Sequence, residues 1–153
     1  MERKKISLNI EYIKTIHYSV NYDCFNVTAS MPLTIEHNKL IFRTNSKIDY
    51  NLDDSLIIIE IELNIIYENS TICSLKCAHG YAIENLKDLI IFDNNDRKIF
   101  SAPYELLIPL LSASHSATRG ILFEKNCTTL FCHFFFPPVD ARTLIPEKSE
   151  KLS

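Results

Sequence analysis

The sequence predicts an α+β domain, in which a four-stranded antiparallel sheet comes first and a long helix and a short C-terminal helix follow. Alternation of apolar and polar residues dominates the first ninety positions, and this period of two is typical of half-buried strands. From residue 102 to residue 119 the apolar spacing changes to that of an amphipathic helix. Strands followed by helices, with no βαβ alternation, are the pattern of an α+β fold.

Length and charge limit the class of protein further. With 153 residues the chain is expected to form one domain over residues 1–153, with residues 147–153 as a flexible tail. A formal net charge of −3 gives no case for a nucleic-acid partner, which would need a basic patch. The basic N-terminus is followed by alternating residues and not by an apolar run, so we expect a cytoplasmic protein without membrane insertion.

The first strand is predicted over residues 6–20, "ISLNIEYIKTIHYSV". Its apolar residues share one face if the alternation is strict, broken only by Lys14. The predicted buried face consists of Ile6, Leu8, Ile10, Tyr12, Ile16, Tyr18 and Val20.

A long connection over residues 21–38 follows this strand. It is too long for a hairpin and too apolar for an ordinary solvated loop, so we expect it to cross over part of the sheet. Its apolar side chains either anchor the connection on the core or form an exposed binding surface. These side chains are Tyr22, Phe25, Val27, Met31, Leu33 and Ile35.

Three further strands form an antiparallel meander, because polar turns at residues 51–54 and 68–70 separate them. Leu40, Phe42, Ile48 and Tyr50 mark the second strand. The third carries Ile57, Ile59, Ile61, Leu63, Ile65 and Tyr67, and the fourth carries Cys73, Leu75, Cys77 and Tyr81.

The long helix is predicted from the segment at residues 102–119. Its second half consists almost entirely of Ser, Ala and Thr, so its backbone can pack closely against a neighbour. Pro109 is expected to lie near the helix start or to kink the helix. Gly120 is predicted to end the helix as a left-handed C-terminal cap, and Arg119 suits the negative end of the helix dipole. Asp140 is predicted to cap a brief last helix that runs to Ile145.

No motif in the chain indicates catalysis, a cofactor or a metal site. The five cysteines are an odd number, and their spacing does not match a zinc signature. Cys73 and Cys77 would lie about 13 Å apart along a strand, too far to share one ion. We therefore expect the cysteines to be small core residues, and the histidines lack the partners that general acid–base chemistry needs.

The order of these elements resembles the SecB protein-export chaperones, as a divergent member would. The resemblance rests on residues 52–83, "LDDSLIIIEIELNIIYENSTICSLKCAHGYAI", which are similar to the third and fourth strands of that family. It rests also on "LLSASHSATRGIL" at residues 110–122, similar to the long helix and its Arg-Gly, and on "PPVDARTL" at residues 137–144, similar to the stretch that opens the last helix.

The resemblance implies a homotetramer, a dimer of dimers, that holds non-native polypeptides in hydrophobic grooves without ATP or a cofactor and is not an enzyme. The implied client-binding residues are Tyr22, Phe25, Val27, Met31, Leu33, Ile35, Leu40 and Phe42. The implied oligomer interface is Ala113, Ser114, Ala117 and Thr118, on a helix closed by Gly120.

Two departures from the family keep alternatives open. The aromatic-proline motif reads "YELLIPLL" here, and the tail "EKSEKLS" lacks the signature for contact with the translocase motor. Transfer of clients to that motor is therefore open, as is a SecB-like role in a toxin–antitoxin system. An oligomeric adaptor or scaffold with one dedicated protein partner is the alternative from another class, and an enzyme or carrier with an enclosed apolar pocket is a third.

Overall fold

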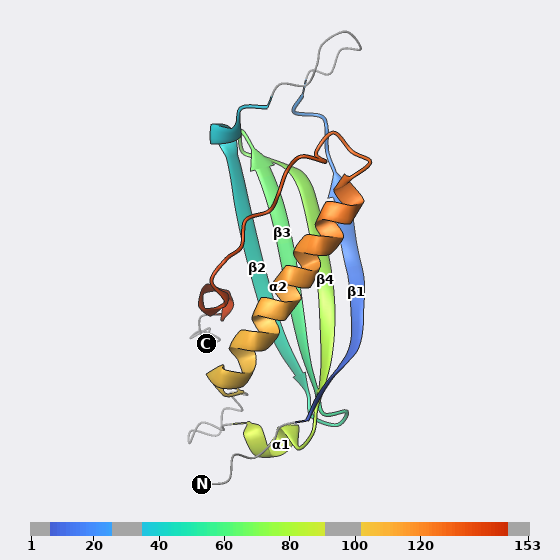
Figure 1. The fold of residues 1–153 in the computed structure, drawn as a ribbon, viewed down its shortest axis with the longest axis vertical. Helices are drawn as coiled ribbons and strands as arrows, with labels where there is room; N and C mark the ends of the chain where they lie inside the picture. The colour runs from blue at the N-terminus through green and yellow to red at the C-terminus, as the bar shows by residue number, and fades with distance from the viewer. Residues whose placement is uncertain (1–6, 26–34, 91–101, 147–153) are drawn as a thin grey trace, which may run out of the picture.

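The computed structural model describes residues 7–25, 35–90 and 102–146 and contains one four-stranded antiparallel sheet (Figure 1). The strand order is β1-β4-β3-β2, and the helix α2 (Tyr104–Asn126) lies diagonally across one face. The predicted α+β arrangement is confirmed, including the crossover between the first two strands, which lie at opposite edges of the sheet. The strands are β1 (Leu8–Val20), β2 (Leu40–Asn51), β3 (Leu56–Tyr67) and β4 (Ser70–Ile83).

The meander of β2, β3 and β4 has the predicted turns. Glu68 and Asn69 join β3 to β4, and both have positive φ, 45° and 68°. Two left-handed residues in a two-residue loop give the twist that antiparallel strands need. The turn between β2 and β3 includes Ser55, also at positive φ.

Strand β1 differs from the prediction in its faces and in its burial. Its register against β4 shifts between Ile10 and Tyr12 and again between Thr15 and His17, so the strict alternation does not hold. Tyr12 pairs with Gly80 on the face opposite α2, while Ile13 pairs with His79 on the helix side. Most of the strand is exposed, because α2 packs mainly on β3 and β4. The prediction of one half-buried apolar face is therefore wrong for β1.

The core lies between α2 and the central strands β3 and β4. The helix-facing isoleucines and leucines of β3 are fully buried, and so are Leu75 of β4 and Leu111 of α2. The C-terminal segment, which we define as residues 127–146, passes over the edge of this layer and adds Phe131 and Phe136 to the core. The buried face of α2 consists of Leu107, Leu110, Leu111, Ser114, His115, Thr118, Leu122 and Asn126.

Gly120 does not end the helix, which corrects the predicted cap. No described glycine has positive φ, and α2 continues for six residues beyond Gly120 to Asn126. Tertiary contacts explain the extension: Leu122 is buried in the core, and Asn126 accepts hydrogen bonds from the sheet. The helix ends at Cys127, whose N–H bonds the carbonyls of Phe123 and Glu124.

The remaining elements are short. Pro109 lies inside α2 on an exposed position, and the helix begins at Tyr104. The last helix, η2 (Ala141–Leu144), is one 3-10 turn, and the Asp140 carboxylate accepts the Arg142 N–H at 2.9 Å as predicted. The other elements are η1 (His37–Lys39) and α1 (Leu86–Leu89). Val27, Met31, Leu33 and the predicted tail at residues 147–153 lie outside the described residues.

By length and composition alone, α2 would also be long and apolar enough to cross a membrane. In this fold three of its large apolar residues, Leu107, Leu111 and Leu122, are buried in the core that α2 forms with the sheet. A core helix of this kind passes the same length test as a membrane span.

Candidate functional site

β1 is an exposed edge strand, and no other described strand pairs with its outer side. Its 13 residues lie at the end of the sheet, so the backbone groups on one side have no partner within the sheet. Exposed apolar side chains line it, among them Ile10 at 61% and Ile13 at 47% exposure. A long apolar edge is a template for pairing with another chain unless something covers it.

Tyr12 fixes the inner side of this strand against β4. A Cβ at Gly80 would lie 2.3 Å from Cε1 of the Tyr12 ring, so only glycine lets the ring lie directly on the sheet. The contact is on the face opposite α2. Farther across that face, Lys76 forms an ion pair with Glu60 at 2.7 Å, which is typical of a solvated sheet surface.

A row of buried polar contacts joins α2 to β4, and we call it the polar seam. The Tyr81 hydroxyl lies 2.7 Å from Ser114 Oγ, and His79 Nε2 lies 2.8 Å from Thr118 Oγ1. Asn126 Oδ1 accepts from the Tyr18 hydroxyl at 2.9 Å and from the Cys73 thiol at 3.4 Å. Burial lowers the pKa of His79 to about 4, so the ring is neutral at pH 7.

Two of the four residues of the predicted oligomer interface belong to the polar seam instead. Ser114 and Thr118 are fully buried against the chain's own sheet and present no surface to another subunit. Ala113 is exposed and Ala117 partly exposed. Together with the exposed Ser112 beside them, Ala113 and Ala117 are the small residues that remain for the predicted association.

The predicted client-binding residues that the structure describes lie at the two ends of the connection between β1 and β2 and on β2 itself. Tyr22 stacks on Phe131 with ring centroids 5.3 Å apart, and Phe25 lies 5.3 Å from the Tyr67 ring. Phe42 meets Phe136 edge to face at 5.3 Å. Phe25, Phe42, Ile35 and Leu40 are partly buried against the core. Their contacts hold the ends of this connection and β2 on the core.

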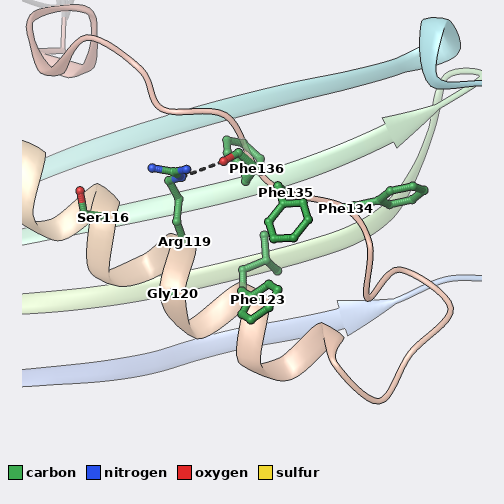
Figure 2. Close-up of a pocket in the computed structure, with 8 residues that line it drawn as sticks. Ser116, Arg119, Gly120, Phe123, Phe134, Phe135 and Phe136 are labelled. Carbon is green, nitrogen blue, oxygen red and sulfur yellow. Dashed lines mark hydrogen bonds between the residues drawn. The ribbon is translucent and has the colours of Figure 1, made fainter.

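A pocket of about 290 Å³ lies between α2 and the C-terminal segment (Figure 2). Arg119 reaches from the helix and donates from Nε to the Phe136 carbonyl at 2.8 Å. Phe123 of α2 and Phe135 of the segment stack at 5.4 Å and are 44% and 70% exposed. The lining consists of Ser116, Arg119, Gly120, Leu122, Phe123, Phe134, Phe135 and Phe136.

The sequence did not reveal this pocket. The aromatic run at residues 134–136 indicated only an apolar approach to the last helix. The signal was nevertheless present, since a simple linker would not carry large apolar side chains such as Leu130 and Phe135, which are 51% and 70% exposed.

The cysteines match the prediction only in the sheet. Cys73 and Cys77 are buried, and burial raises the pKa of both thiols, that of Cys73 to about 11. Both are therefore core thiols and not nucleophiles. Cys24 and Cys132 are half-buried and Cys127 is exposed, so the core prediction is wrong for Cys127. Among the residues that the structure describes, no three histidine, cysteine or acidic side chains are grouped to hold a metal.

Neither a protein-family model nor a curated protein sequence matches this chain. In fold, the chain is similar to a SecB-like chaperone. That structure is the Mycobacterium tuberculosis Rv1957 SecB-like chaperone in complex with a ChAD peptide from the Rv1956 HigA1 antitoxin. The identity is 9% and the TM-score 0.49, over 86% of this chain and 87% of the other. A protein of unknown function from Streptococcus agalactiae is also similar, at 12% identity and a TM-score of 0.40 over 88% and 98% of the two chains.

Proposed function

We propose that this protein is an ATP-independent holdase that keeps non-native polypeptides from aggregating by binding them on apolar surface. The observation that carries the proposal is the aromatic pocket, where Phe123 and Phe135 stack on one another and still expose 44% and 70% of their surface. Exposed, clustered aromatic side chains gain free energy when an unfolded segment covers them. Binding of this kind needs no catalytic residue, metal or cofactor.

We further propose that the chain assembles into a homotetramer, a dimer of dimers. Such an assembly needs two different self-complementary surfaces. The small residues Ser112, Ala113 and Ala117 of α2 suit one close contact, and the exposed edge of β1 suits strand pairing with a second copy. The chain's resemblance to SecB favours this assembly and a cytoplasmic role in protein export, or in a related process such as toxin–antitoxin control.

The test is suppression of aggregation of a chemically denatured client protein, followed by light scattering without ATP. The holdase is expected to suppress scattering at near-stoichiometric amounts, and ATP should change nothing. The variant Phe135→Ser should suppress less while keeping its melting temperature, because Phe135 is largely exposed. The matched control is Thr71→Ser, at another exposed position.

Absence of any suppression at a tenfold excess would contradict the proposal. Protection of one partner and of no unrelated client would instead favour the adaptor or scaffold with a dedicated partner.

A further inference from the structure

The aromatic pocket contains one charged side chain, Arg119, and that charge has no acidic partner in the part of the chain that the structure describes. Arg119 is half-buried, and its guanidinium points toward the backbone of Phe136 (Figure 2). Within the described residues, its one hydrogen bond runs from Nε to the Phe136 carbonyl, at 2.8 Å. That bond holds the guanidinium in place and leaves the terminal Nη groups to a ligand.

A partly buried guanidinium without a counter-charge favours an anionic ligand. Charge-assisted hydrogen bonds to a carboxylate are about twice as strong as neutral ones, and a planar guanidinium can make two of them. The ring of His115 lies 6.2 Å from Phe136 and does not add a second charge, since burial and the nearby Arg119 lower its pKa. The pocket therefore offers one fixed positive charge in apolar surroundings.

The rest of the lining favours a large apolar side chain. Outside its chain neighbours and the helix backbone, a Cβ at Gly120 would meet no atom within 4 Å, so α2 leaves open space at this position of the lining. The volume of about 290 Å³ is at the small end for ligand pockets and suits one large side chain and its neighbour. The exposed surfaces of Phe123 and Phe135 continue beyond the rim, as a chain passing through the pocket would need.

We infer that the pocket binds a segment of non-native polypeptide in which a large apolar side chain stands next to an acidic side chain. The apolar group covers the aromatic rings, and the carboxylate pairs with Arg119. This inference rests on the proposed holdase function and gives it a selectivity, because a purely apolar surface would not distinguish an acidic neighbour from its amide.

Binding of fluorescently labelled peptides tests this inference by anisotropy. Two unstructured 12-residue peptides that differ only in a central Phe-Glu or Phe-Gln serve as probes. The unmodified protein is expected to bind the Phe-Glu peptide about tenfold more tightly, from the charge-assisted bonds that only the carboxylate accepts. Arg119→Gln should bind both peptides equally, whereas Arg142→Gln, at an exposed arginine outside the pocket, should keep the preference.

A second variant keeps the test decisive if loss of the Phe136 contact loosens the C-terminal segment. Gly120→Leu puts a side chain into the open space of the pocket, and leucine is a better helix former than glycine, so the fold should persist. This variant is expected to lose the preference for Phe-Glu. Glu105→Leu, at an exposed position of α2 outside both the lining and the small residues proposed for assembly, is its matched control and should retain that preference.

Equal binding of the two peptides by the unmodified protein would overturn the inference and leave the holdase proposal intact. An unchanged preference in Gly120→Leu would overturn the pocket as the site. Binding of a fatty acid such as oleate without binding of either peptide would replace the polypeptide by a small ligand. Failure to bind either peptide, together with failure to suppress aggregation, would refute both proposals.

Discussion

Acidification from pH 7 to pH 4 is expected to destabilise the packing of α2 on the sheet, because His79 would then carry a proton in a site built for a neutral ring. His79 is fully buried, and Nε2 lies 2.8 Å from Thr118 Oγ1. Thr118 donates its own hydroxyl proton to the Ser114 carbonyl, so its oxygen accepts from the His79 Nε2–H. The other ring nitrogen, Nδ1, has no hydrogen-bond partner. A second proton would place an unpaired charged donor in the core.

The direction and the size of this change in stability follow from the pKa of His79 in the unfolded chain and in the folded chain. In the unfolded chain His79 takes up a proton near pH 6.5, whereas burial lowers its pKa in the folded chain to about 4. Between these two pH values the unfolded state binds more protons than the folded state, so the free energy of unfolding falls as the pH falls. The full contribution of neutral His79 to stability is present only above about pH 6.5. The gap of about 2.5 pH units corresponds to about 3 kcal/mol at ~1.36 kcal/mol per unit.

Urea unfolding followed by circular dichroism at pH 7, 6, 5 and 4 measures this effect. Comparison with His79→Leu isolates it, because both proteins carry the same carboxylates. The unmodified protein should lose about 3 kcal/mol more than the variant over this range. His17→Gln, which removes an exposed histidine on β1, should follow the unmodified protein. Parallel curves for the unmodified protein and His79→Leu would refute the reasoning.

Three further predictions concern assembly, anchoring and the β1 contact. Ala113→Phe should split the proposed tetramer, since overpacking typically costs about 1 to 3 kcal/mol per site, and light scattering that finds the unmodified protein monomeric would contradict the assembly. Phe25→Ser should lower the free energy of unfolding by about 1 to 2 kcal/mol, because its ring packs on Tyr67 and Phe131; unchanged stability with weakened client binding would make it a client contact instead. Gly80→Ala should lower the melting temperature by displacing the Tyr12 ring, and Tyr12→Ala should remove most of that loss in the double variant; an equal loss in both backgrounds would mean that the ring is not the cause.

The sheet could be predicted because strands β2, β3 and β4 are bounded by local signals. Alternation and polar turns determine where each begins and ends, and the left-handed residues Glu68 and Asn69 confirm the hairpin. Strand β1 could not be predicted to the same degree. Its two register shifts depend on how it pairs with β4, some sixty residues later in the chain, and no local pattern encodes them.

The end of α2 and the partners of its small residues also could not be predicted from local sequence signals. A glycine after a helical segment is a sound local signal for a cap, yet α2 passes through Gly120 because Leu122 and Asn126 find partners in the core. The family resemblance implied an oligomer interface at Ser114 and Thr118, and their actual partners are the polar side chains of β4. The pocket was missed because it exists only where the C-terminal segment returns along α2.

The polar seam also limits how far α2 can move along the sheet. A helix held on a sheet by leucine and isoleucine alone can slide along it, since one apolar contact replaces another. Here hydrogen bonds at Ser114, Thr118 and Asn126 tie three successive parts of the helix to particular side chains of the sheet. A slide of one turn, about 5.4 Å, would break all three at once. The helix therefore stays in one register, and under the proposed holdase function the pocket would adjust to its ligand through the C-terminal segment opposite the helix.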